Sequence, residues 1–189
     1  PFHAVIWPAM LMGHGNLNLP TNVPANQYLT FGGNKASASR GVGRSIAWYT
    51  DRLQPDALRY SVASLFPEQN DTDFSDGEII RRVNDELVAT WGNLVNRVLS
   101  MSDRNFDGKV PEPGELTEND REIVELGAKT LVKVGDHIEA VELRAGLRAS
   151  LDAAGMVNAY LNATEPWNVL KEDVERGGTI LWAAIQAIS

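Results

Sequence analysis

The spacing of apolar residues changes near residue 76. Before that point, short apolar runs alternate with Pro, Gly and Asn, a texture that favours strands, short helices and loops. Beyond it, apolar residues recur every three or four positions, which is the period of amphipathic helices. We therefore predict two domains, a mixed α/β region at residues 1–76 and an all-helical region at residues 77–189.

Two helices are expected in the first region. The apolar stretch from Phe2 to Met12 favours a helix that ends at Gly13, and Pro8 should interrupt or kink it because proline lacks an N–H group. The second helix should open at Pro55, since proline suits the first helical turn. Between these helices, Val23 and residues 28–31 are typical of short strands, and residues 32–34 of a turn.

Four helices are predicted beyond residue 76, over about 77–101, 117–134, 138–161 and 172–188. The apolar stripe of the first helix consists of Ile80, Val83, Leu87, Leu94 and Val98. Thr117 and Asp120 have the spacing of a capping box at the start of the second helix. The connections are mostly short, which favours an antiparallel helical bundle.

Composition excludes several classes of protein. The 189 residues are 43% hydrophobic and 22% charged, as in ordinary globular proteins, and no apolar run has the length of a membrane span, so we expect no membrane partner. The chain has no cysteine, which excludes disulfides and thiolate zinc sites, and we expect no metal site. The net charge of −8 means that any RNA contact must be local. The start at Pro1, without Met, suggests a partial chain.

The segment from Phe31 to Gly41 could bind phosphate. It combines glycines with two cations, Lys35 and Arg40, and with the hydroxyls of Ser37 and Ser39. Such a loop can wrap a polyphosphate and stabilise charge that develops on it. On spacing alone, an ordinary surface loop is the simpler interpretation.

The same segment resembles the second signature of class I aminoacyl-tRNA synthetases, Lys-Met-Ser-Lys-Ser. Lys35, Ser37 and Ser39 match it, whereas Ala36 and Ala38 replace the Met and the second Lys. The flanking stretches at residues 2–11, 55–60 and 82–88 are similar to methionyl-tRNA synthetases. The resemblance covers essentially the whole chain.

The resemblance implies a fold and an activity. The fold is the C-terminal half of a class I nucleotide-binding (Rossmann-like) catalytic domain, followed by an all-α antiparallel helical-bundle anticodon-binding domain. The family activates methionine with ATP, accompanied by Mg²⁺, and transfers it to tRNA(Met) in the cytoplasm. Lys35, Ser37 and Ser39 would be catalytic, with Lys35 on ATP, and Asn26 and Leu29 match positions near the adenine.

A methionine pocket is expected on the first helix. His3 and Trp7 are four residues apart, so a helix places them on one face, with Phe2 adjacent. Aromatic rings suit a polarizable thioether, although aromatic residues on a helix usually belong to a core. The resemblance implies that Phe2, His3 and Trp7 help to bind methionine.

An anticodon site is expected on the bundle. Asn93 and Arg97 are four residues apart and lie off the apolar stripe, and both can read the edge of an unstacked base. Trp167, expected in a loop, could stack on that base. On the sequence alone, a solvated Asn, a surface Arg and a Trp that covers the end of the bundle are the simpler interpretation. The resemblance implies that these three residues recognise the CAU anticodon.

Two alternatives remain open. Ala36 and Ala38 motivate a non-catalytic tRNA-binding relative that has lost its chemistry. The run from Asp103 to Gly108 resembles the start of a calcium-binding EF-hand loop, but Gly114 occupies the position that needs Glu. The resemblance also places the first signature upstream and a final bundle helix downstream. We therefore expect that this polypeptide alone cannot form methionyl-adenylate, which methionine-dependent exchange of pyrophosphate into ATP would contradict.

Overall fold

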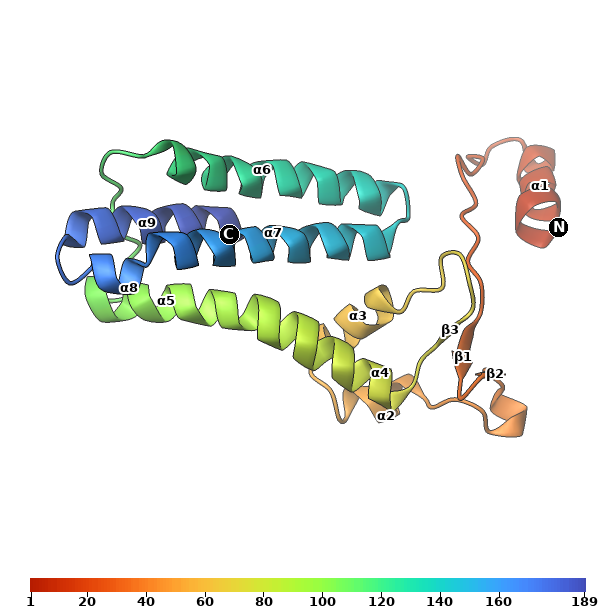
Figure 1. Ribbon diagram of the computed structural model, residues 1–189. Coiled ribbons are helices and arrows are strands. Elements are labelled where there is room, and N and C mark those ends of the chain that lie inside the picture. The colour runs from red at the N-terminus through yellow and green to blue at the C-terminus, as the bar shows by residue number, and fades with distance from the viewer.

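The computed structural model describes residues 1–189, and it contains two regions of different architecture (Figure 1). Short helices and a small sheet make up the first region, and long helices make up the second. The predicted order, a mixed α/β region followed by an antiparallel helical bundle, is confirmed. No helix combines the length and the apolar character needed to cross a bilayer.

The chain begins with a helical segment that stands apart from the bundle (Figure 1). A π-helical stretch, η1 (Phe2–Ile6), leads directly into α1 (Trp7–His14). Pro8 lies where the winding changes, which agrees with the predicted interruption. The predicted end at Gly13 is wrong, because the helix continues to His14 and closes at Gly15, whose φ of 84° is accessible to glycine.

A three-stranded sheet carries the loop that contains Lys35. Its strands are β1 (Leu29–Phe31), β2 (Asn34–Lys35) and β3 (Thr72–Asp73), in the order β2-β1-β3. β1 pairs antiparallel with β2 and parallel with β3. Both glycines of the turn between β1 and β2 have positive φ angles. The predicted strand at Val23 is wrong, since its backbone pairs with no neighbouring strand.

Short helices complete the first region. They are η2 (Ala38–Arg40), α2 (Ile46–Thr50) and α3 (Pro55–Ser64), and the predicted start at Pro55 is confirmed. Four buried residues form a small core: Tyr49, Leu65, Phe74 and Ile79. This core joins the sheet and α2 to the first turns of the long helix that follows.

One continuous helix connects the two regions. It consists of α4 (Asp76–Arg81), the π-helical η3 (Arg82–Gly92) and α5 (Asn93–Phe106). The predicted stripe is wrong at Ile80, which is 58% exposed, whereas Ile79 is buried. Ile79 is buried because it faces the small core of the first region, where it packs with Tyr49 and Phe74. The helix also extends five residues beyond the predicted end at 101, to Phe106.

Three further long helices complete the bundle: α6 (Glu118–Glu139), α7 (Leu143–Thr164) and α9 (Val174–Ile188). The capping box of Thr117 and Asp120 is confirmed. The predicted boundary near residue 138 is wrong, because α6 continues to Glu139 and the turn forms around Val141, whose φ is 61°. Successive helices run in opposite directions (Figure 1).

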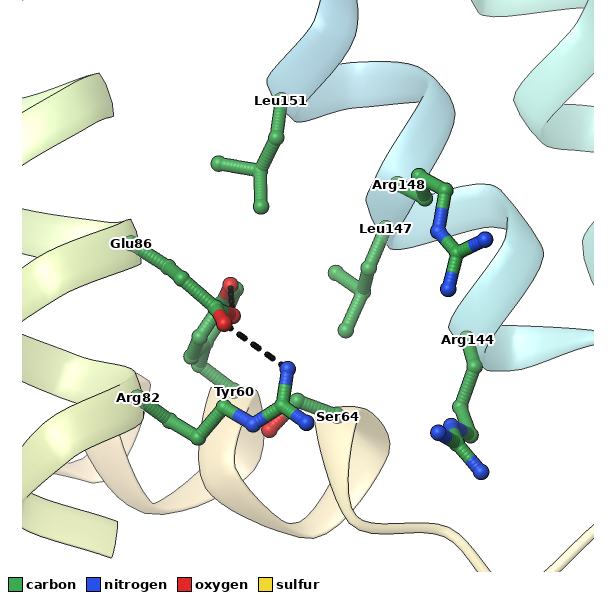
Figure 2. A pocket seen from close by; sticks show the side chains of 8 residues that line it. All are labelled: Tyr60, Ser64, Arg82, Glu86, Arg144, Leu147, Arg148 and Leu151. Carbon is green, nitrogen blue, oxygen red and sulfur yellow. Dashed lines mark hydrogen bonds and ion pairs between the residues drawn. The ribbon is translucent and has the colours of Figure 1, made fainter. Parts of the chain in front are cut away.

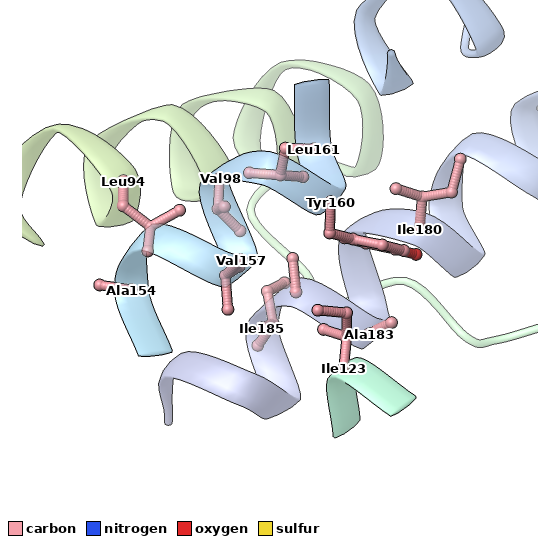
Figure 3. Packing of buried hydrophobic residues seen from close by; sticks show 11 residues of the cluster. Leu94, Val98, Ile123, Ala154, Val157, Tyr160, Leu161, Ile180, Ala183 and Ile185 are labelled. Carbon is pink, nitrogen blue, oxygen red and sulfur yellow. The ribbon is translucent and has the colours of Figure 1, made fainter. Parts of the chain in front are cut away.

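The bundle core lies between the inner faces of α5, α6, α7 and α9 (Figure 3). It contains these buried residues: Leu94, Val98, Ile123, Ala154, Val157, Tyr160, Leu161, Ile180, Ala183, Ala184 and Ile185. Small residues on α9 let the neighbouring helices approach closely. The core holds the start of α5, which carries Asn93 and Arg97, and the end of α7 in fixed positions.

Candidate functional site

The loop between β2 and α2 is closed at its base by backbone hydrogen bonds. The N–H groups of Ser37 and Val42 each donate to the carbonyl oxygen of the other, at 3.0 and 2.9 Å. Inside this ring, the hydroxyls of Ser37 and Ser39 share a hydrogen bond of 3.3 Å. Gly41 closes η2 with a φ of 65°. The structure therefore brings the two serines together on an exposed loop of defined shape.

Lys35 lies at the entry to this loop and contacts an aromatic ring. Its Nζ atom is 3.5 Å from the centre of the Tyr28 ring, a cation–π contact. At exposed sites such contacts are worth about 0.5–1 kcal/mol, so an anion that binds more strongly can draw Lys35 away at little cost. Lys35 makes no ion pair with a carboxylate in the structure.

Asp73 anchors the turn that precedes the loop, a role that the sequence analysis missed. Its Oδ1 atom accepts hydrogen bonds from the hydroxyl of Thr30 at 3.0 Å and from the N–H of Gly33 at 2.9 Å. The signal in the sequence is weak, because Asp73 lies 40 residues beyond Gly33 and only the parallel pairing of β1 with β3 brings them together.

The aromatic residues of the first helix line one shallow depression. Phe2, His3 and Trp7 share it with Ile6 and Met10. Phe2 is 70% exposed and Trp7 46% exposed, so the surface is apolar and open. The predicted juxtaposition of these three side chains is present, but α1 lies well away from β2, the strand that ends at Lys35 (Figure 1).

Asn26 and Leu29 occupy different environments. The side chain of Asn26 is exposed and donates to the carbonyl of Gln27 at 2.8 Å. Leu29 begins β1 and packs against the small core of the first region. The structure therefore does not bring these two side chains to one point.

At the far end of the bundle, Arg97 and Trp167 are in contact. The Arg97 guanidinium carbon is 4.6 Å from the centre of the Trp167 ring, and its Nη2 donates to Oδ1 of Asn162 at 2.8 Å. Trp167 lies on the single turn α8 (Pro166–Val169), so the prediction of a loop is wrong. Asn93 lies one turn before Arg97 and bonds the carbonyl of Ala89.

Asn162 is a further member of this cluster that the sequence analysis missed. It projects from the last turns of α7, and its exposed amide fixes the guanidinium of Arg97. An arginine held against an indole presents a flat, partly polar surface on which a base can stack. The residues come from α5, α7 and α8, so no local pattern could reveal the cluster.

The calcium interpretation is wrong. Residues from Asp103 to Phe106 belong to α5, so the backbone is helical where an EF-hand needs its first ligands on a loop. Asp107, with a φ of 52°, ends the helix. The segment is the connection that leaves the first helix of the bundle.

The folded regions and the loop define a class of protein. A small mixed sheet in which β2 ends at Lys35 and leads into a loop with Ser37 and Ser39, followed by a helical bundle, is the arrangement of a class I aminoacyl-tRNA synthetase. Residues 1–99 match the family model described as tRNA synthetases class I (M). Residues 110–189 match the anticodon binding domain of methionyl tRNA ligase. The chain belongs to the methionyl-tRNA synthetase family.

Individual relatives agree along the whole chain. It is 46% identical to the methionine–tRNA ligase of Roseiflexus castenholzii over 188 residues and 42% identical to that of Corynebacterium glutamicum over 203 aligned positions, each covering 100% of the chain. These alignments span 32% and 33% of the relatives' own length, so the chain corresponds to about a third of each.

A solved structure has the same fold. The crystal structure of Mycobacterium tuberculosis methionyl-tRNA synthetase bound by methionyl-adenylate is 30% identical and superimposes with a TM-score of 0.87. The match covers 99% of this chain and 37% of that one. The likeness therefore includes both regions and the connection between them.

Proposed function

We propose that the full-length protein is a methionine–tRNA ligase, which activates methionine with ATP and transfers the methionyl group to tRNA(Met). The observation that carries the proposal is the likeness of the entire chain, through both regions, to a synthetase bound to methionyl-adenylate. Such a reaction belongs to protein synthesis, and we place it in the cytoplasm. We also propose that the catalytic part ends near residue 76.

The loop residues would act on the phosphates of ATP, which arrives with Mg²⁺. Lys35 would leave the Tyr28 ring and stabilise the negative charge that develops on the departing pyrophosphate. The paired hydroxyls of Ser37 and Ser39 can donate to phosphate oxygens once they separate from each other. Asn26 and Leu29 would lie near the adenine.

The remaining predicted residues would bind methionine and the anticodon. The open depression of Phe2, His3 and Trp7 offers ring edges to a thioether. Arg97 and Trp167 would receive an unstacked base, and Asn93, one turn away, would bond its edge. The two sites lie in different regions, as expected when activation and tRNA selection are separate events.

A tRNA-binding relative without catalysis is the second candidate. It is favoured by Ala38, which offers neither charge nor hydroxyl where the family signature has its second Lys. Arg40 follows two residues later and has no carboxylate partner, so a cation remains available at this loop. We therefore prefer a catalytic synthetase that reacts at a reduced rate over this non-catalytic relative.

Two assays on the purified full-length protein test the proposal. Methionine-dependent exchange of pyrophosphate into ATP should be present, and Lys35→Gln should reduce it strongly. No exchange in the unaltered protein, with tRNA binding retained, would establish the non-catalytic relative.

The anticodon assignment needs a separate test. Tryptophan fluorescence should report tighter binding of an anticodon stem-loop with CAU than of one changed at its first anticodon base. Trp167→Ala should remove about 1–3 kcal/mol of binding, while Trp167→Phe, which retains a stacking ring, should keep most of it. Equal binding of both loops by the unaltered protein would refute the assignment of Asn93, Arg97 and Trp167.

A further inference from the structure

A small cavity lies at the junction between the two regions and is rich in arginine (Figure 2). Its walls come from α3, η3 and α7, and its volume is about 130 Å³. Its lining is Tyr60, Ser64, Arg82, Glu86, Arg144, Leu147, Arg148 and Leu151. Three guanidinium groups and one carboxylate surround this space in a protein whose net charge is −8.

The single carboxylate of the cavity orients one arginine. Glu86 accepts a hydrogen bond from Arg82 at 2.7 Å and another from the Tyr60 hydroxyl at 2.6 Å, so each of its oxygens has a partner. The pKa of Tyr60 is raised by burial and by the bond to Glu86, which keeps the hydroxyl protonated. The Nε atom of Arg82 is buried and has no hydrogen-bond acceptor, and its one ionic contact is with Oε2 of Glu78 at 3.7 Å, beyond hydrogen-bonding distance.

The other two arginines have no ionic partner. Arg144 and Arg148 are four residues apart on α7, and neither makes an ion pair. Like charges at this spacing repel each other and destabilise a helix. Glu68 accepts a hydrogen bond from the backbone N–H of Arg144 but makes no ion pair with its guanidinium. An anion in the cavity would relieve this repulsion and satisfy Arg82.

We propose that this cavity binds one phosphate of the RNA backbone when tRNA occupies the protein. Guanidinium groups bond phosphate oxygens in pairs, which makes arginine the preferred residue for such a site. The cavity is small beside the roughly 300–1,000 Å³ of sites that enclose a whole ligand, so it accepts a phosphate group and no complete nucleotide.

The position of the cavity favours RNA over a free nucleotide. Arg82 belongs to the same continuous helix as Arg97, roughly 20 Å away at about 1.5 Å of rise per residue. An RNA that contacts Trp167 with its anticodon can therefore reach the cavity with its backbone. The inference rests on the proposed function in one respect, because that function identifies the bound RNA as tRNA.

The test measures how tRNA binding depends on salt concentration, and it compares the unaltered full-length protein with two double variants. The variant Arg144→Gln/Arg148→Gln removes two exposed charges, and Arg121→Gln/Lys133→Gln removes the same charge from exposed positions of α6 as a control. A lost phosphate contact should weaken binding of tRNA(Met) several-fold and reduce the slope of log affinity against log salt by about 1. The control should retain the slope of the unaltered protein, and circular dichroism should show equal helix content.

Other outcomes separate the possible sources of phosphate. An unchanged salt slope of tRNA binding in the α7 variant overturns the inference. The inference is also overturned if this variant loses affinity for inorganic phosphate or ATP while the salt slope of its tRNA binding stays the same. If the unaltered protein shows no methionine-dependent exchange and no preference for CAU, but the slope still falls for any tRNA, the proposed function fails and the phosphate site stands.

Discussion

Asp120 illustrates how one side chain can join three helices. It has no exposed surface, and its two oxygens accept bonds from both terminal nitrogens of Arg176, at 2.6 and 3.0 Å. The Tyr160 hydroxyl and the N–H of Thr117 also donate to it. Burial by itself would raise the pKa of Asp120, but these four donors lower it well below its ordinary value.

Asp120→Asn should destabilise the bundle by about 3–5 kcal/mol, because Arg176 would lose its counter-charge while remaining partly buried. Denaturant unfolding followed by circular dichroism measures this loss. Asp152→Asn provides the control, since Asp152 is exposed on α7 and makes no ion pair. Equal stability of the two variants would contradict the role given to Asp120.

The same carboxylate predicts how stability depends on pH. Because the pKa of Asp120 is lower in the folded protein, its contribution is fully present above the ordinary aspartate value of 3.8 and is lost as pH falls through the folded value. Unfolding free energy should therefore decline below about pH 4 more steeply in the unaltered protein than in Asp120→Asn. Parallel curves from acid titrations would show that another group dominates.

At the scale of elements, the approach of α6 to α9 depends on one glycine. A Cβ atom at Gly127 would lie 2.9 Å from the Cα atom of Ala187, a backbone atom that cannot rotate away. Eight residues later on the same helix, Gly135 has no heavy atom within 4 Å of such a position. The two glycines therefore differ in role, although both lie within the same continuous helix, α6.

Gly127→Ala should cost about 1–3 kcal/mol of unfolding free energy, because α6 and α9 would have to separate. Gly135→Ala should stabilise by up to about 1 kcal/mol, since alanine favours the helix and meets open space. Thermal unfolding of the pair separates packing from helix propensity. If both variants gain stability, Gly127 is not required for the close approach of α6 to α9.

At the scale of the whole molecule, the two regions are joined by packing and by hydrogen bonds, one of which involves Glu68. α3 packs against η3 and α7, which brings the first region beside the start of the bundle helix. Glu68, which follows α3, accepts the N–H of Arg144 at 2.9 Å in the first turn of α7. An acidic group at a helix N-terminus is stabilising because it bonds free N–H groups and meets the positive end of the dipole.

Glu68→Ala should lower the melting temperature of the whole protein and remove about 0.3–1 kcal/mol, since the first turn of α7 would lose its acceptor. The amide of Arg144 should also exchange its hydrogen faster. Glu122→Ala, at an exposed position of α6 without an ion pair, is the matched control and should change neither quantity. Unchanged exchange at Arg144 would argue against this bond.

The sequence alone determined which of the longer helices form and in what order. Pro55, the capping box of Thr117 and Asp120, and the repeat of apolar residues act within a few residues of one another, so their effects can be derived without the fold. The loop with Lys35, Ser37 and Ser39 was also identifiable, because its residues are contiguous. The residue numbers of the domain boundary and the roles of the site residues stay predictions.

Only the tertiary structure decided what distant residues do together. The small core of the first region placed Ile79 inside instead of Ile80, and the packing of α3 against η3 and α7 brought three arginines to one cavity. Asp73 reached Gly33 through a parallel strand pair, and Asn162 reached Arg97 across two helices. Such contacts join residues far apart in the chain, so they follow from packing and not from local pattern.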